Sequence, residues 1–168
     1  MSDKMRNFFD SMASFFGVGD DLPWTDAHII STCEREAAGE GAGLSKDSDM
    51  SDTIMRLSWA LVHSRRSSDV QRGIAMLEAA LSNDIGPTQK RETLYLLAVG
   101  HYRAEDYGRS RQYISQALEI APDFRQALTL KKIVEDKIAK DGVIGIGIAV
   151  AAAGVVAAGL AAALSRRN

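Results

Sequence analysis

The sequence predicts an all-α protein in which six antiparallel helices stack one on the next, followed by one C-terminal transmembrane helix. Two observations support this prediction. Apolar residues recur at spacings of three and four rather than two, which is the period of a helix. The stretch from Gly142 to Leu164 holds 23 residues without a charged or polar side chain. The chain therefore divides into an N-terminal arm (1–23), a helical domain (24–141), a membrane anchor (142–164) and a short basic tail (165–168).

The first two helices are expected at about residues 24–38 and 53–64. Pro23 opens the first helix, and proline is tolerated there because the first N–H groups of a helix have no intrahelical partner. One face of this helix carries Ile30, Cys33 and Ala37. A loop rich in glycine and acidic residues follows, after which Ser51 or Asp52 can cap the second helix.

The remaining four helices are expected at about residues 69–83, 88–103, 107–120 and 124–140. The third helix has an apolar stripe at spacings of four, three and four, formed by Val70, Ile74, Leu77 and Leu81. N-cap residues mark the starts of the last three, at Thr88, Asp106 and Asp123.

A repeat is visible within these helices. Residues 94–122 match the tetratricopeptide pattern of small, aromatic and apolar positions at Leu97, Ala98, Tyr107, Ser110, Ile114, Ala117 and Pro122. A weaker copy at residues 73–81 lies 37 positions upstream, one repeat of about 34 residues plus a longer turn. A generic helical bundle is the alternative, but the register favours a tetratricopeptide-like stack in which small residues let paired helices approach closely.

The apolar stretch 142–164 predicts a tail anchor. As a helix it is ~33 Å long, enough to cross a hydrocarbon core of ~30 Å. A buried core helix is the alternative, but such a helix needs a polar face, which this stretch lacks. Because only four residues follow, ending in Arg166, Arg167 and Asn168, we expect nearly all of the protein to face the cytosol.

The composition of the anchor predicts its membrane. Alanine and glycine dominate it, so the span is only modestly hydrophobic, which is typical of mitochondrial outer-membrane and peroxisomal anchors that end in a basic tail. Gly154, Ala158 and Ala162 form a stripe of small residues at spacing four, a weak signal for self-association.

The charge balance and the absence of known motifs exclude other classes of protein. The helical residues 53–141 carry 14 basic and 11 acidic side chains, too little excess for a nucleic-acid binder. His28, His63 and His101 fall on separate expected helices without partners at metal-ligand spacing, and Cys33 is best interpreted as a buried thiol. No nucleophile or phosphate-binding motif occurs. We expect no catalytic residue, no metal, no cofactor and no small-molecule substrate.

Three segments resemble the mitochondrial fission 1 protein family. They are Leu-Ala-Val-Gly-His-Tyr-Arg at residues 97–103, Trp-Ala-Leu-Val-His-Ser at residues 59–64, and Lys-Asp-Gly at residues 140–142. The resemblance covers about residues 24–168, and the long front part looks like a plant or algal form. It implies a non-catalytic receptor on the outer mitochondrial and peroxisomal membranes, which recruits a dynamin-related GTPase or its adaptors for division.

In a tetratricopeptide stack the first helices of each pair line a concave groove. Projecting the register gives eight candidate partner-binding residues: Met55, Ser58, Val62, Arg65, Tyr95, Val99, Tyr102 and Arg103. Tyrosine and arginine are favoured interface anchors, so this set suits a short peptide or helix. Val62 and Val99 can equally be core. A tail-anchored co-chaperone or import receptor that binds peptide termini is the alternative function, but its cationic clamp would need more than two groove arginines.

The N-terminal arm offers a ligand for this groove. Its apolar residues form one face of a short helix: Phe8, Phe9, Met12, Phe15 and Phe16. Such a patch needs cover from the groove, the membrane or a partner. Residues 1–52 carry 11 acidic and 4 basic side chains, which slightly favours the basic stack as the cover. We hypothesise that the arm occupies the groove and must leave before a partner binds.

Overall fold

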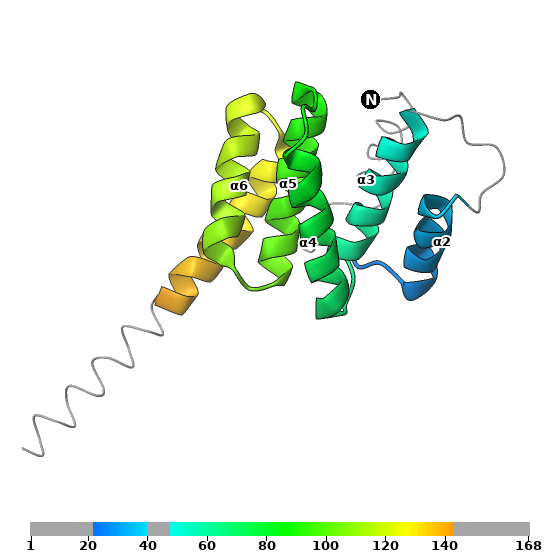
Figure 1. Ribbon diagram of the computed structural model, residues 1–168. Helices are drawn as coiled ribbons and strands as arrows, with labels where there is room; N and C mark the ends of the chain where they lie inside the picture. Colours follow the sequence, from blue (N-terminus) through cyan, green and yellow to red (C-terminus); the bar gives the residue numbers. More distant parts are fainter. Residues whose placement is uncertain (1–21, 40–47, 143–168) are drawn as a thin grey trace, which may run out of the picture. The chain divides into compact units, whose positions relative to one another are not determined.

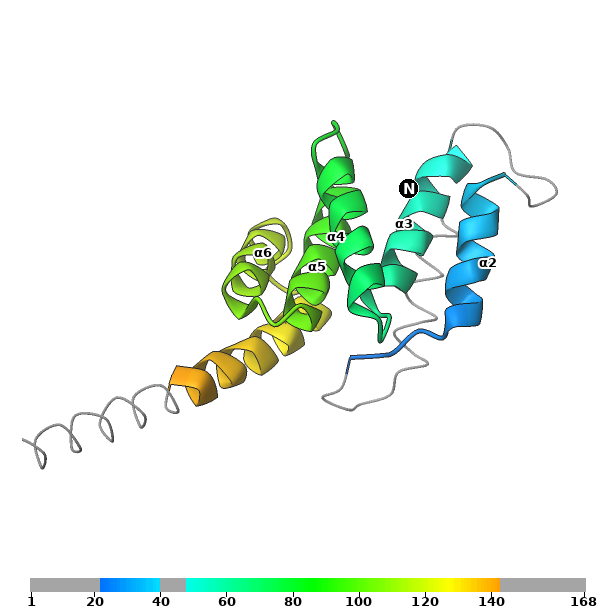
Figure 2. The same cartoon turned by 60° about the horizontal axis from the view of Figure 1, so that its bottom comes forward.

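The computed structural model describes residues 22–39 and 48–142. Within these ranges there are six helices and no strand: α2 (Ala27–Ala37), α3 (Ser48–Val62), α4 (Ser67–Leu81), α5 (Pro87–Arg103), α6 (Tyr107–Ile120) and a last helix at residues 125–142. The labelled helices follow one another side by side in chain order, as Figure 1 and the turned view in Figure 2 both show. The predicted all-α stack of six helices is confirmed.

The first helix begins later than predicted. α2 starts at Ala27, with Asp26 as its extended N-cap residue, whereas we expected it to start directly after Pro23. The preceding residues are extended because the N–H of Thr25 donates to the carbonyl oxygen of His63 at 2.9 Å, forming an isolated parallel bridge with Ser64. Tertiary hydrogen bonding therefore outweighs the favourable position of proline in a first helical turn.

Three other helices begin earlier than predicted. α3 begins at Ser48, because serine and acidic residues that resemble a loop are also favourable in a first helical turn. α4 begins at Ser67, and α5 begins with Pro87 as its first helical residue and Gly86 as its cap. Asp106 is confirmed as the cap of α6, since its side chain accepts a hydrogen bond from the Arg109 N–H.

The core lies where α3, α4 and α5 cross. Val62 is fully buried between two glycines of the neighbouring helices. A Cβ atom on Gly73 would lie 2.8 Å from Val62 Cγ1, and one on Gly100 would lie 3.2 Å from the same atom and 2.7 Å from Ile74 Cγ1. Distances under 3.0 Å leave no room for a side chain, so the close approach of the three helices requires both glycines.

The pair α5 and α6 is joined through the small positions of the repeat. The Ser110 hydroxyl donates to the carbonyl oxygen of Ala98 at 2.8 Å, and Ala117 is fully buried. The last helix then buries Ala127, Leu130 and Val134. Residues 135–142 continue as helix and are exposed apart from a half-buried Ile138.

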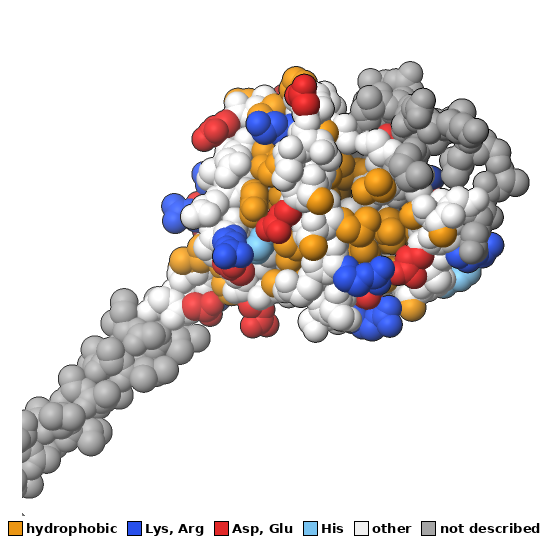
Figure 3. Space-filling view, in the orientation of Figure 1, with side chains coloured by type: hydrophobic (Ala, Val, Ile, Leu, Met, Phe, Trp, Pro, Cys, Tyr) orange, Lys and Arg blue, Asp and Glu red, His pale blue; other side chains and the backbone are white. Residues whose placement is uncertain are grey.

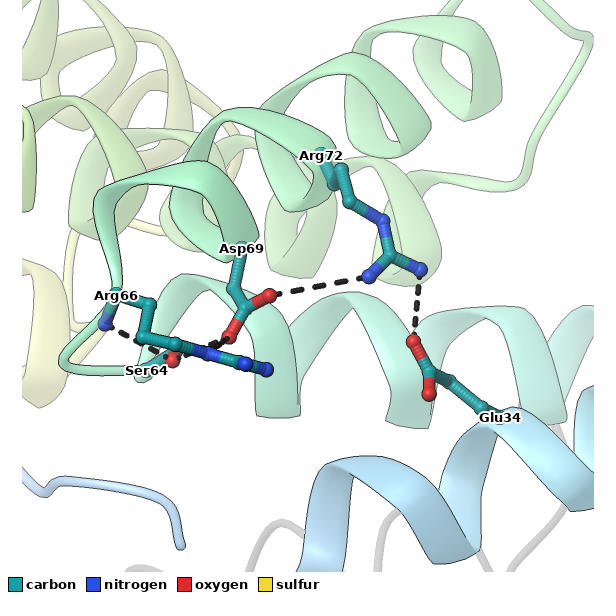
Figure 4. A network of polar contacts seen from close by, with 5 residues as sticks. All are labelled: Glu34, Ser64, Arg66, Asp69 and Arg72. Atoms are coloured by element: carbon teal, nitrogen blue, oxygen red, sulfur yellow. Dashed lines mark hydrogen bonds and ion pairs between the residues drawn. The ribbon is translucent and has the colours of Figure 1, made fainter. Parts of the chain in front are cut away.

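A polar network fixes the turn between α3 and α4 (Figure 4). Asp69 is buried, and its Oδ2 accepts hydrogen bonds from Ser64 Oγ at 2.7 Å and Arg66 Nε at 2.8 Å. Burial alone would raise the pKa of Asp69, but these hydrogen bonds and the charges of Arg66 and Arg72 outweigh it and hold the pKa below its ordinary value. The carboxylate therefore stays ionised and ties the two helices of the first repeat together.

α2 contacts the stack through one buried side chain and two ion pairs. Ile30 is its one buried residue. Glu34 pairs with Arg72 of α4 at 2.8 Å, and Glu36 pairs with Arg56 of α3 at 3.1 Å. Figure 3 shows basic and acidic side chains gathered where α2 approaches the α3–α4 turn, beside the apolar side chains in the middle of this face.

None of the helices in residues 22–39 and 48–142 is long and apolar enough to cross a membrane. Apart from Gly142, the predicted anchor and basic tail lie outside the described residues, including Arg166 and Arg167. The five apolar arm residues, Phe8, Phe9, Met12, Phe15 and Phe16, lie outside them as well.

Candidate partner-binding groove

α3 and α5, the first helices of the two repeats, contact each other directly. Near their N-terminal ends, Gln89 Nε2 donates to Ser51 Oγ at 2.8 Å. Near their C-terminal ends, residues 22–25 are bonded to both the end of α3 and Arg103 at the end of α5. The pair therefore forms a platform with a polar link at each end.

The candidate residues from α3 are buried. Met55, Ser58 and Val62 all lie inside, and the Ser58 hydroxyl donates to the carbonyl oxygen of Ile54 in its own helix. Val62 contacts the two glycine positions described above. Of the two interpretations that the sequence left open for Val62, the structure favours the core.

Three of the four candidate residues from α5 are partly accessible: Tyr95, Tyr102 and Arg103. Val99 is fully buried, whereas Tyr95 and Tyr102 are half-buried. The Tyr95 ring meets Phe124, just before the last helix, edge-on at 5.2 Å, and burial raises the pKa of Tyr95 to about 12. The Tyr102 ring lies 5.8 Å from that of Tyr107. The two tyrosines of α5 therefore contact aromatic rings just before the last helix and at the start of α6.

The two candidate arginines converge on one side chain that the groove prediction did not include. Arg65 Cζ lies 4.8 Å from the centroid of the Trp24 ring, and Arg103 Cζ lies 3.4 Å from it. Trp24 nevertheless keeps 45% of its surface exposed. A guanidinium over an exposed indole face contributes about 0.5–1 kcal/mol, so the two contacts stabilise this position of the ring only modestly.

The backbone beside Trp24 is bound as well. Arg103 Nη2 donates to the carbonyl oxygens of Leu22 and Pro23, at 2.8 and 2.9 Å. The Thr25 N–H donates to His63, as described above, while the buried Thr25 hydroxyl has no hydrogen-bond partner. We call residues 22–25 the strap. It lies across the C-terminal ends of α3 and α5 and places its tryptophan between the two groove arginines.

Sequence reasoning missed the strap because Pro23 was interpreted as the start of a helix. The signal that could have found it is Asp26, a favoured N-cap residue placed directly before the apolar face of α2. A helix capped at Asp26 leaves Pro23 and Trp24 outside it, in the extended conformation that also suits the residue before a proline.

His63 and His101 are structural, whereas His28 is exposed on α2. Burial lowers the pKa of His63 to about 4, and its Nδ1 lies 2.7 Å from the carbonyl oxygen of Trp59. Burial also lowers the pKa of His101, whose ring stacks on Tyr113 at 5.3 Å. In the described part of the chain, no three His, Cys, Asp or Glu side chains come together as a metal site would require.

Burial, followed by the nearby Glu36 charge, raises the pKa of the half-buried Cys33 thiol. A thiol of this kind is a poor nucleophile, because the thiolate is the reactive form. The geometry around α3 and α5 is therefore suited to binding rather than to bond making.

Comparisons with known proteins identify both repeats. The Fis1 N-terminal tetratricopeptide repeat matches residues 52–84, and the Fis1 C-terminal tetratricopeptide repeat matches residues 91–143. Mitochondrial fission 1 protein A of Arabidopsis thaliana is 54% identical over 148 residues, which cover 88% of this chain and 86% of that protein. Mitochondrial fission 1 protein B of the same plant is 53% identical over 155 residues, 89% of this chain and 90% of that protein.

Solved structures share the fold. The crystal structure of Fis1 from Saccharomyces cerevisiae has a TM-score of 0.60 at 22% identity, covering 74% of this chain and 92% of that one. Yeast Fis1 in complex with an Mdv1 fragment also has a TM-score of 0.60 at 22% identity, covering 72% and 91%.

The matched repeats, the plant relatives and the shared stack agree with the resemblance that the sequence motifs predicted. Fis1 proteins are tetratricopeptide-like adaptors rather than enzymes, which removes the enzyme class. This chain belongs to the mitochondrial fission 1 protein family.

Proposed function

We propose that this chain is an adaptor for mitochondrial and peroxisomal fission, and that its α3–α5 groove binds a dynamin-related GTPase or an adaptor of that GTPase. The observation that carries the proposal is the platform of α3 and α5 with aromatic and arginine side chains along it. The names of the plant relatives support the fission role. The yeast Fis1 complex with an Mdv1 fragment supports a groove that binds protein partners.

Within the groove, the binding surface is assigned to the residues that retain accessible atoms. Arg65 is exposed, and Tyr95, Tyr102 and Arg103 are half-buried. The other four candidates, Met55, Ser58, Val62 and Val99, support this surface from below. Their role is to fix the spacing of α3 and α5, so that the tyrosines and arginines meet a partner at set positions.

The arm is proposed to cover the groove when no partner is present. This is supported by the strap, because Leu22 and Pro23 are bonded to Arg103 at the end of α5, so residues 1–21 join the described chain beside the groove. It is also supported by the acidic excess of the front of the chain against the basic excess of residues 53–141. An arm in this position competes with any partner for the same rings.

The membrane assignment rests on the sequence of the C-terminal segment. Residues 142–164 are proposed to anchor the protein in the mitochondrial outer membrane and the peroxisomal membrane, with the helical domain in the cytosol. Arg166 and Arg167 are proposed to be part of the targeting signal. The stripe of small residues in this span is proposed to let copies of the chain associate. Imaging a tagged chain with and without residues 142–168 tests the anchor: the full chain should mark both organelles, and the truncated chain should be cytosolic.

Capture from cytosol distinguishes the proposed function from a co-chaperone that binds peptide termini. The full-length chain, held in lipid vesicles, should enrich a dynamin-type GTPase or an adaptor of it over vesicles alone. A chaperone enriched in its place would contradict the proposal. The structure gives one reason to expect fission partners: both groove arginines already contact Trp24, so neither is held ready as a carboxylate clamp.

A further inference from the structure

We propose that Ser68 is a phosphorylation site for a protein kinase that recognises arginines before its target serine. The site lies in the first helical turn of α4, directly after the turn that joins α3 to α4. It goes beyond the proposed recruitment function, because it concerns a covalent modification and involves no fission partner. The residues concerned all lie within the described part of the chain.

The sequence before Ser68 has the charge pattern that one class of kinase selects. Arg65 and Arg66 stand three and two positions before it, in the run Arg-Arg-Ser-Ser at residues 65–68. Kinases discriminate substrates by charges at fixed distances from the acceptor residue, and two arginines at these positions suit an acidic substrate groove. Both arginines are exposed, so a kinase can reach them. Ser67 follows the same arginines one position too early for this spacing.

The Ser68 hydroxyl is accessible and makes no bond that modification would break. Ser67 and Ser68 are both exposed, and neither side chain makes a hydrogen bond within residues 22–39 and 48–142. The other serines with described side chains all take part in a hydrogen bond: Ser31, Ser51, Ser58, Ser64, Ser82, Ser110 and Ser115. Ser68 is therefore a better acceptor than the serines that support the fold.

The backbone before Ser68 favours access by a kinase. Arg66, the N-cap residue of α4, is extended, with φ −91° and ψ 122°. Its side chain bonds Asp69 Oδ2 rather than an N–H of the first turn. A first turn without a side-chain cap opens locally more readily than the centre of a helix, and a kinase binds its substrate as extended chain. Because Ser68 is the second helical residue, opening of this one turn is enough to present it.

The reaction transfers the γ-phosphoryl group of ATP to Ser68 Oγ. A bond forms between this oxygen and the γ-phosphorus, the bond from that phosphorus to the bridging oxygen of ATP breaks, and ADP leaves. The hydroxyl proton passes to the catalytic carboxylate of the kinase. The phosphoserine that results carries a charge of about −1.5 to −2 at neutral pH.

Arg72 is positioned to pair with the new phosphate. Ser68 and Arg72 are four residues apart on α4, the spacing at which an acidic group and a following basic group interact on a helix surface. The Arg72 side chain is 53% exposed, and Figure 4 shows it extending toward Glu34 of α2, with which it pairs at 2.8 Å. The helix dipole also favours a negative charge in the first turn. We therefore expect Arg72 to be shared between the phosphate and Glu34, while the buried Ile30 keeps α2 in place.

Phosphorylation changes the charge at one end of the groove. Residues 64–72 carry three basic side chains and one acidic side chain, an excess of two positive charges that a phosphate would nearly cancel. Arg65 belongs to this segment and contacts Trp24 at the C-terminal ends of α3 and α5. The modification therefore turns a basic surface beside the groove into a nearly neutral one.

The test treats the full-length chain in detergent micelles with ATP and the catalytic subunit of cyclic-AMP-dependent protein kinase, which selects serines that follow two arginines. Mass spectrometry of the intact chain and of its peptides measures the amount of phosphate and its position. Ser68 should carry the phosphate, and Ser68→Ala or Arg65→Gln should each lower the rate of incorporation at least about tenfold. Ser67→Ala is the matched control and should be phosphorylated as the parent chain is.

Hydrogen exchange then tests where the phosphate binds. In the phosphorylated chain, amide exchange in the first two turns of α4 should be slower by about twofold to fivefold, and Arg72→Gln should reduce this effect. Unchanged exchange would overturn the pairing with Arg72.

Three results would overturn the phosphorylation site itself: absence of phosphate from Ser68 of the folded chain, equal incorporation into Ser68→Ala and the parent chain, or equal incorporation into Arg65→Gln and the parent chain. Circular dichroism of each variant establishes that the helices are intact. Since the assay contains no fission protein, its failure would leave the recruitment proposal standing, and a failed recruitment assay would leave this result standing.

Discussion

His63 links the end of α3 to the core through a neutral imidazole. Its ring is buried, stacks on Trp59 at 4.4 Å, and places Nδ1 2.7 Å from the Trp59 carbonyl oxygen. A neutral ring with its proton on Nδ1 satisfies this carbonyl at little cost, whereas a charged ring would have to be desolvated. The lowered pKa of His63 follows from that burial, and it makes the stability of the domain depend on pH.

We expect the free energy of unfolding to fall as the pH is lowered from about 6.5 to about 4. In this window the unfolded chain binds a proton at His63, whose ordinary pKa is 6.5, and the folded chain does not, because its pKa there is about 4. The loss from this one residue is at most about 3 kcal/mol, and the lowered pKa of His101 adds to it in the same direction. Denaturant unfolding at pH 7 and pH 5 measures it; His63→Gln should reduce the difference, and an unchanged difference would contradict the account.

Gly73 is required by the close approach of α3 and α4. Gly73→Ala places a Cβ 2.8 Å from Val62 Cγ1 and 3.1 Å from a backbone nitrogen, so we expect a net loss of about 1–3 kcal/mol, even though alanine is the better helix former. Gly108→Ala, in the first turn of α6 with no atom closer than 3.8 Å, is the matched control and should be neutral or slightly stabilising. Equal melting temperatures for the two variants would show that the crossing is looser than described.

At the scale of the helix, α2 is the element with the weakest attachment. Its ion pairs are accessible to solvent, with Arg72 and Glu34 at 53% and 40% exposure and Arg56 and Glu36 at 31% and 34%, so each pair contributes about 0–1 kcal/mol. Ile30 is its one buried side chain, and truncation of such a residue costs about 2–5 kcal/mol. The docking of α2 therefore depends on one apolar contact more than on its visible charges.

Hydrogen exchange tests this order of importance. Ile30→Ala should speed amide exchange in α2 strongly while α5 stays protected, because the helix detaches locally. Glu34→Gln should change exchange in α2 only slightly. If Glu34→Gln matched Ile30→Ala, or if both accelerated exchange throughout the domain, α2 would not be a separately attached element.

The helices also show where a sequence pattern is enough to predict an element. The apolar stripe of α4 and the cap at Asp106 predicted their helices well, because local propensity and tertiary packing agree there. The predicted start of α2 was wrong because the backbone N–H of Thr25 donates to the carbonyl oxygen of His63, a residue far along the chain. A local sequence pattern cannot predict such a bond. The earlier start of α3 escaped notice because serine and aspartate suit both a loop and a first helical turn.

At the scale of the whole molecule, the groove too was predicted only in part from the sequence. The repeat register placed Arg65, Tyr102 and Arg103 near the ends of the first helices, because helical periodicity decides which residues share a face. It could not separate surface from core for Val62, since that depends on glycines in two other helices. It could not find Trp24 at all, because the strap is extended and its position is set by contacts with both repeats.

Deleting the arm tests its relation to the groove. A chain lacking residues 1–20 keeps the strap and all of the described helices, so we expect it to bind the fission partner more tightly than the full chain does. The reason is that the partner no longer competes with the apolar face of the arm. Titrating the captured partner against both chains in vesicles measures the change, and equal affinities would show that the arm does not occupy the groove.

The central claim, that the α3–α5 groove recruits the fission machinery, is tested most directly by the amount of dynamin-related GTPase, or of its adaptor, that vesicles carrying the full-length chain bind. Tyr102→Ala removes a half-buried ring from the groove, and Tyr113→Ala removes a half-buried ring from α6 that stacks on His101. We predict that Tyr102→Ala lowers the affinity for the partner at least about tenfold, as expected for an interface anchor. Tyr113→Ala should keep the affinity of the parent chain, and its helices should stay intact. Equal binding by the two variants would contradict the claim.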